Sequence, residues 1–138
     1  MNDTAIYPGV RDALTRLQAS GMRLGVFTGA TKRAAELQLE HADLRSFFGS
    51  VVGSDQIGAV KPAPDGIHRA CSELAVRPWK AAYVGDAIND LRCARAARAM
   101  PVGAGWGHLY ESDGVPHLVA NDLDELVEMM IAEPGRSI

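Results

Sequence analysis

The sequence predicts an α/β protein built on a doubly wound parallel sheet with helices on both faces. Short apolar runs alternate along the chain with segments in which apolar residues recur every three or four positions. The apolar runs are continuous rather than alternating, which is typical of strands covered on both faces. A sheet of this Rossmann-like class binds its ligands beyond the carboxyl ends of its strands.

Each element is predicted from the local spacing of apolar residues and from the residues that start or end helices and strands. We expect helices where the apolar spacing is helical, at residues 10–20, 31–41, 65–74, 88–97 and 122–132. We expect strands at the apolar runs between them, at residues 22–27, 50–53, 81–84, 100–102 and 118–119. Pro8-Gly9 opens the first helix, Ser20-Gly21 ends it, and Thr31 can cap the second. The length of 138 residues suits one domain, which we expect to span residues 1–138.

Composition argues against several classes of function. Hydrophobic residues make up 47% of the chain and charged residues 22%, as in ordinary globular proteins. The formal net charge of -3, without a long run of like charges, predicts neither a nucleic-acid nor a membrane partner. Two cysteines make no disulfide framework, so we expect a cytoplasmic location with Cys71 and Cys93 as packing residues. The scattered histidines lack metal-ligand spacing, which predicts surface or capping roles for His41, His68, His108 and His117.

Thr28 and Gly29 follow the first expected strand and lead into a helix. A hydroxyl followed by small residues can place backbone N–H groups and a helix N-terminus against an anion, so this turn is a candidate phosphate site. A strand-to-helix turn capped by Thr31 would use the same residues without binding anything. For this segment alone, both interpretations stay open.

Lys61 lies in a loop that contains prolines at positions 62 and 64. The following proline keeps Lys61 out of helical geometry, and the two prolines stiffen the loop. A lysine fixed in this way is a compact positive charge suited to a phosphoryl group or to neighbouring carboxylates. On composition alone, a solvated loop lysine is the simpler interpretation.

Asp86 and Asp90 lie at another strand-to-helix junction, one helical turn apart and on the same side. Two carboxylates placed there can hold Mg2+, which prefers oxygen ligands and keeps several waters. Alternatively, Asp86 is an N-cap and Asp90 a first-turn acid favoured by the helix dipole. Because Thr28 and Asp86 both end strands, parallel pairing would bring them to one edge of the sheet, which favours a shared site.

Taken in order, these segments resemble the motifs of the haloacid dehalogenase superfamily, particularly its phosphoglycolate phosphatase-like branch. The likeness covers nearly the whole chain. Thr28 resembles the second motif of that family, residues 61–64 resemble the third, and Gly85-Asp86 with Asp90 resembles the fourth. The resemblance implies a Mg2+-dependent hydrolase whose substrate is a small phosphorylated metabolite.

The resemblance also implies a role for each site residue. Thr28 and the Gly29 backbone would bind the phosphoryl oxygens, and Lys61 would neutralise the phosphoryl group and the nucleophile. Asp86 would ligate Mg2+, and Asp90 would support the waters of the metal or Lys61. These roles amount to charge stabilisation and positioning in the transition state.

The resemblance fails at the start of the chain. The first motif of the family is a strand ending Asp-x-Asp-x-Thr, whose first aspartate attacks phosphorus and whose second protonates the leaving group. Here only Met1 and Asn2 precede the first acid, Asp3, and no apolar strand leads to it. That strand is central in the family, between the strands that end at Thr28 and Asp86. We therefore expect a partial core without nucleophile or cap domain, and impaired hydrolysis by residues 1–138.

Two other classes of function are considered. A non-catalytic descendant of the same family, keeping a phosphate- or metal-binding edge as an interaction module, would bind without turnover. A two-component receiver domain needs its acidic residues first, whereas the order here is Thr28, Lys61, Asp86. A dinucleotide-binding fold would need a Gly-x-Gly-x-x-Gly turn, which this chain lacks.

Sheet edges exposed beside the missing strand would favour self-association as a homodimer.

Overall fold

The computed structural model describes residues 8–107, 110–112, 114–115 and 117–132. Within this part of the chain the helices are α1 (Val10–Ala19), α2 (Lys32–His41), α3 (Asp65–Leu74), α4 (Ile88–Ala97) and α5 (Leu123–Ile131). The strands are β1 (Gly25–Phe27), β2 (Ser50–Val52), β3 (Ala82–Gly85), β4 (Met100–Ala104) and β5 (Leu118–Ala120). Every expected helix and strand is confirmed. Three short 3-10 helices, too brief to show a period, were not expected: η1 (Arg45–Phe47), η2 (Ser54–Gln56) and η3 (Pro78–Lys80).

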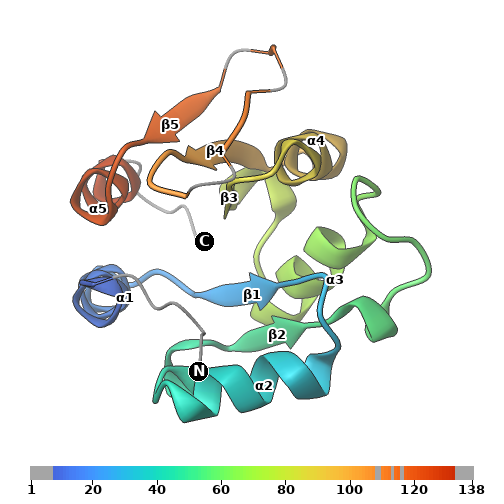
Figure 1. Ribbon diagram of the computed structural model, residues 1–138, viewed down its shortest axis with the longest axis horizontal. Coiled ribbons are helices and arrows are strands. Elements are labelled where there is room, and N and C mark those ends of the chain that lie inside the picture. The colour runs from blue at the N-terminus through green and yellow to red at the C-terminus, as the bar shows by residue number, and fades with distance from the viewer. Residues whose placement is uncertain (1–7, 108–109, 113, 116, 133–138) are drawn as a thin grey trace.

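The strands form two parallel sheets rather than one (Figure 1). β1 pairs with β2, with Gly25 opposite Ser50 and Phe27 opposite Val52. β4 pairs with β3 on one side and with β5 on the other. Among the described residues no strand pairing joins β1 to β3. The break falls where the family resemblance places the first central strand. Asp3, the first acid of the chain, lies outside the described residues.

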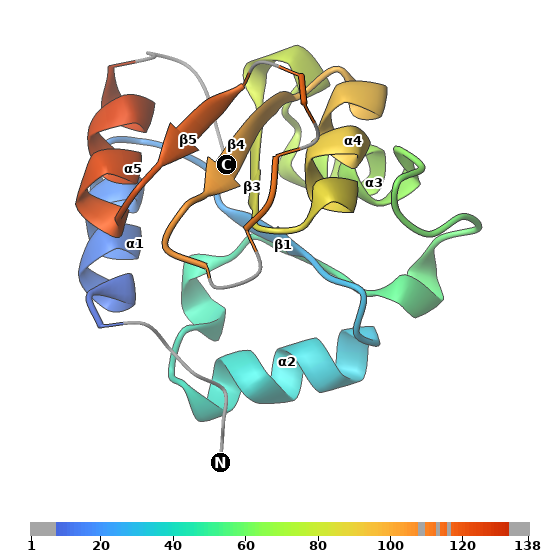
Figure 2. The same cartoon turned by 45° about the horizontal axis from the view of Figure 1, so that its top comes forward.

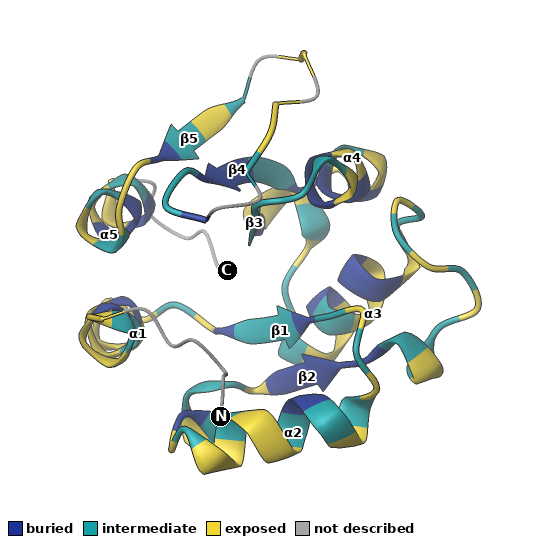
Figure 3. Cartoon of the chain, viewed as in Figure 1, coloured by how far each residue is buried: buried dark blue, intermediate teal, exposed yellow. Residues whose placement is uncertain are grey.

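Two hydrophobic clusters cover opposite faces of the sheets. The first joins α1 and α5 to the strands and includes Leu17 and Val127. The second joins α3 and α4 to the strands and includes Ile67. Adjacent residues of β3 face opposite clusters, Ala82 the first and Tyr83 the second, as a strand covered on both faces requires. Figure 2 shows α1 beside α5 on one side of the strands and α3 near α4 on the other, and Figure 3 shows that the buried residues face inward. The doubly wound α/β class is confirmed.

The helix starts near the strand ends have identifiable causes. Thr31 caps α2 as expected, because its Oγ1 accepts the backbone N–H of Ala34 at 3.2 Å. The N-cap of α4 is Ala87 rather than Asp86, so the interpretation of Asp86 as a helix cap is wrong. Asp90 lies in the first turn of α4, where a negative charge is favoured by the helix dipole. Nowhere in the described part of the chain is a helix long and apolar enough to cross a bilayer.

Candidate active site

A cavity of about 370 Å3 lies at the carboxyl ends of β1 and β3. Its lining includes Thr28 and Gly29 after β1, Lys61 in the loop before α3, and Asp90 in α4. Four of the five predicted site residues therefore surround one space, although they come from three separate segments. The other lining residues are Phe27, Ser54, Ile57, Val60, Ala87 and Asn89. Asp86, the fifth, precedes Ala87 and is not part of the lining.

Lys61 and Asp90 form a largely buried ion pair. The Nζ atom of Lys61 lies 2.7 Å from Oδ1 of Asp90, and the two side chains keep 21% and 11% of their exposure. The other oxygen, Oδ2, accepts the backbone N–H of Ala87 at 3.1 Å. A Cβ atom on Gly85 would lie 2.5 Å from Cβ of Asp90, so glycine allows the helix to bring its carboxylate this close to the strand. Asp90 therefore belongs to the helix start and also holds the lysine.

The loop that carries Lys61 is fastened to α4. The peptide bond between Lys61 and Pro62 is cis. The thiol of Cys93 donates a hydrogen bond to the carbonyl oxygen of Ala63 at 3.2 Å. Burial raises the pKa of Cys93 to about 11, while the positive charge of Lys61 opposes this rise, so the thiol keeps its proton and remains a donor. The packing role expected for Cys93 is confirmed by its burial, and the hydrogen bond adds an anchor for the lysine loop.

The turn after β1 leaves few groups for an anion. The backbone N–H of Thr28 donates to Val52 at 3.0 Å, and its Oγ1 accepts the N–H of Ala30 at 3.2 Å. The first amide of α2, that of Lys32, donates to Oδ1 of Asp55 at 2.9 Å. The groups facing an anion here would therefore be the hydroxyl proton of Thr28 and the exposed Gly29 backbone, rather than the start of α2.

Asp86 offers the kind of oxygen ligand that Mg2+ prefers. Its carboxylate is partly buried and makes no hydrogen bond or ion pair with the residues that the structure describes. Each oxygen of Asp90 accepts one hydrogen bond and keeps a further lone pair. The described ranges contain no group of three or more His, Cys, Asp or Glu side chains able to hold a metal. A Mg2+ bound by one or two carboxylates and several waters needs no such group. The metal roles of Asp86 and Asp90 stay predictions.

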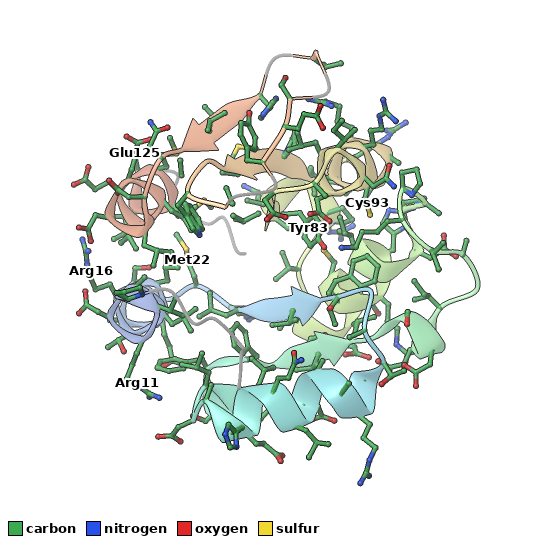
Figure 4. All side chains as sticks on the ribbon, viewed as in Figure 1. Arg11, Arg16, Met22, Tyr83, Cys93 and Glu125 are labelled. Atoms are coloured by element: carbon green, nitrogen blue, oxygen red, sulfur yellow. The ribbon has the colours of Figure 1, made fainter. Side chains whose placement is uncertain are left out.

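Reasoning from the sequence missed two aromatic residues that belong to the site. The Nζ atom of Lys61 lies 5.0 Å from the ring centre of Phe27 and 5.5 Å from that of Tyr83. Tyr83 and Cys93 lie near each other, on the side of the sheets where α3 and α4 pack (Figure 4). Their only sequence signal is position, because Phe27 immediately precedes Thr28 and Tyr83 lies three residues before Asp86.

The chain is similar to a known protein family and to curated phosphatases. Residues 1–104 match the family described as haloacid dehalogenase-like hydrolase. A phosphoglycolate phosphatase from Chromobacterium violaceum is 35% identical over 127 residues, which cover 92% of this chain and 57% of that protein. A phosphoglycolate phosphatase from Escherichia coli (strain K12) is 34% identical over 107 residues, which cover 78% of this chain and 42% of that protein.

Solved structures share the fold. The HAD phosphatase from Thermococcus onnurineus matches with a TM-score of 0.82 at 25% identity, over 96% of this chain and 60% of that one. A HAD-superfamily hydrolase from Ehrlichia chaffeensis, at 21% identity, shows the fold alone, with a TM-score of 0.81 over 96% of this chain and 61% of that one. This chain spans about half the length of the curated relatives it matches. Since the family match covers most of its residues, the chain belongs to the haloacid dehalogenase-like hydrolases.

Proposed function

We propose that this chain carries the phosphate- and Mg2+-binding part of a hydrolase that acts on small phosphate monoesters. The observation that carries the proposal is the shared cavity, in which Thr28, Gly29 and Lys61 converge and Asp90 holds the lysine. Two similar proteins are named phosphoglycolate phosphatases, which supports a small phosphorylated metabolite as the substrate class.

Each residue has a defined task in this proposal. The hydroxyl of Thr28 and the backbone of Gly29 hydrogen-bond the non-bridging phosphoryl oxygens. The ammonium group of Lys61 neutralises their negative charge, and Asp90 keeps that ammonium at the cavity wall. Phosphoryl transfer depends mainly on such positioning and charge stabilisation, so these residues can contribute without any covalent step of their own.

Asp86 is the proposed ligand for Mg2+, with Asp90 in support through its remaining lone pairs. When bound, the ion would supply positive charge to the phosphoryl oxygens. Asp86 lies directly after β3, whose last residue, Gly85, pairs with Gly103 of β4. The position at the end of the strand would therefore fix the backbone of Asp86 before the metal binds.

Hydrolysis by residues 1–138 would need a carboxylate in the cavity that is free to attack phosphorus. Among the described residues that line the cavity, the single carboxylate is Asp90, which is occupied by Lys61. We propose that an attacking carboxylate must come from outside the described residues, and that residues 1–138 alone hydrolyse phosphate esters feebly. The same observation favours the second candidate function, a non-catalytic phosphate- or metal-binding module.

Location and assembly also remain proposals. Cys71 and Cys93 are free and buried, which fits a reducing, cytoplasmic location. The break between β1 and β3 leaves strand edges that a second copy could pair with, so a homodimer is proposed. Sedimentation of the purified protein over a range of concentrations tests the homodimer directly, because a monomer at all concentrations would contradict it.

Turnover of an aryl phosphate, with and without Mg2+, tests the proposed function. The variants are Lys61→Met and Asp86→Ala, and Lys80→Met provides a matched control because Lys80 is exposed and outside the cavity. Mg2+-dependent turnover that both site variants lose and the control keeps would support a hydrolase. Phosphate binding that requires Lys61, without turnover, would support the binding module. Absence of both turnover and binding would contradict the proposal.

A further inference from the structure

The two arms of the candidate site come from different sheets. Thr28 follows β1, whereas Asp86 and Asp90 follow β3, and among the described residues no backbone ladder connects these strands. Contacts other than strand pairing therefore set the distance between the arms. An anion that contacts both Thr28 and Lys61 is sensitive to this distance, because hydrogen bonds weaken steeply when their geometry is disturbed.

The hydroxyl group of Tyr83 makes a hydrogen bond across this break. It donates to the carbonyl oxygen of Phe27 at 3.0 Å, which links β3 to the last residue of β1. The two rings are also in contact, with centres 6.0 Å apart and planes tilted by 37°. These two contacts join β3 to β1 through side chains.

The same two rings form the wall behind the lysine. The ammonium of Lys61 lies within cation–π distance of both Phe27 and Tyr83 while it pairs with Asp90. A Cβ atom on Gly66 would lie 2.1 Å from Cζ of Phe27, so the ring packs directly on the backbone of α3. The ring of Phe27 is thus packed against α3, and the hydroxyl of Tyr83 links the backbone of Phe27 to β3.

We propose that Tyr83 is a positioning residue of the anion site, whose hydroxyl sets the spacing between Thr28 and the Lys61–Asp90 pair. This inference rests on the proposed function, because it assigns Tyr83 a task in the same phosphate site. It adds a residue that lies outside the segments carrying Thr28, Lys61 and Asp86 and that is not among the residues lining the cavity.

Calorimetric titration with inorganic phosphate tests the inference through Tyr83→Phe. This variant keeps the ring that packs beside Lys61 and removes only the hydroxyl. We expect phosphate binding about threefold to tenfold weaker, the range that corresponds to one lost hydrogen bond. Tyr110→Phe is the matched control, because the hydroxyl of Tyr110 bonds to His117 at 2.8 Å and Tyr110 is not among the residues that line the cavity.

A second control separates positioning from general loss of stability. Leu126→Ala removes a buried side chain of the first hydrophobic cluster, so it lowers the melting temperature without touching the cavity. Both proteins are titrated well below their melting temperatures. Weaker phosphate binding in Tyr83→Phe, with unchanged binding in Leu126→Ala, supports the inference. Equal weakening in the two variants overturns it, because stability alone would then explain the result.

The remaining outcomes are also decisive. Unchanged phosphate binding in Tyr83→Phe, with binding lost in Lys61→Met, overturns the positioning role and leaves the proposed function intact. Absence of binding by the unaltered protein overturns both. Should Tyr83→Phe fail to fold, NMR of the unaltered protein decides, since phosphate should shift the ring signals of Tyr83 together with the Thr28 amide. Ring signals that stay unchanged at saturation overturn the inference.

Discussion

Lys61 and Asp90 are joined at 2.7 Å across the wall of the cavity, and both side chains are largely buried. The pair unites a proline-containing loop with the first turn of α4. Because the second oxygen of Asp90 accepts the N–H of Ala87, the lysine partner is itself fixed by the helix start. A charged group is thus held in place before any ligand binds, which is the condition for strong electrostatic stabilisation of a phosphoryl group.

Breaking this pair should lower stability. Lys61→Met leaves the Asp90 carboxylate buried without its counter-charge, and we expect a loss of about 2–4 kcal/mol in the free energy of unfolding, somewhat less than for a fully buried pair. Urea unfolding measures this loss. The double variant Lys61→Met/Asp90→Leu should be less destabilised than the sum of its single variants. Simple additivity would mean that the two residues do not interact in solution.

Asp86→Ala should remove Mg2+ binding with little effect on the fold. Among the described residues the Asp86 carboxylate has no hydrogen-bond partner, so its removal leaves none of those groups unsatisfied. MgCl2 should raise the melting temperature of the unaltered protein by mass action and leave that of Asp86→Ala unchanged. Asp65→Ala, which alters an exposed acid at the start of α3, is the control. An equal rise in the Asp86 and Asp65 variants would contradict the assignment.

Alkaline pH should destabilise the protein partly through Cys93. Burial raises the pKa of this thiol from 9.0 to about 11, so between these values the unfolded chain ionises while the folded protein does not. The free energy of unfolding should therefore fall as pH rises through this interval, by at most about 1.4 kcal/mol per pH unit from this group. Cys93→Ala should flatten the slope, while the parts due to Cys71 and Tyr83 remain, because burial also raises the pKa values of these two groups. Parallel curves for the two proteins would contradict the buried thiol donor.

Thr31→Ala should destabilise α2 by about 1 kcal/mol, because it removes the oxygen that accepts the N–H of Ala34. Thr15→Ala offers a matched control, since Thr15 is exposed on α1 and, among the described residues, its hydroxyl bonds only the carbonyl of Arg11 in its own helix. That change should be close to neutral. Urea unfolding compares the two variants, and equal losses would argue against a specific capping effect of Thr31.

Local pattern predicted the elements because periodicity and turn chemistry act within a few residues. The bounds of α3 and α4 follow directly from their apolar spacing and from the residues before them. The same reasoning left Asp86 open between a helix cap and a metal ligand, and the structure excludes the cap by placing Ala87 there. Asp90 is the first-turn acid of α4 and also pairs with Lys61, while its metal role stays a prediction.

Contacts across the fold could not be predicted in this way. The Tyr83–Phe27 hydrogen bond depends on how two unpaired strands are spaced, and the Cys93–Ala63 hydrogen bond depends on how α4 packs against a loop. The residue types do not predict such contacts, because a tyrosine or cysteine in a strand or helix is normally interpreted as a residue of the hydrophobic core. The hydrogen-bond partners of these side chains lie far away in the sequence and are determined only by the packing of the fold.

Titration of 15N-labelled residues 1–138 with inorganic phosphate tests the central claim most directly, because it needs no turnover. The account predicts saturable shifts of the Thr28 and Gly29 amide signals that are abolished in Lys61→Met and preserved in Lys80→Met. Signals that do not respond, or that respond equally in both variants, would contradict a phosphate site formed by these residues.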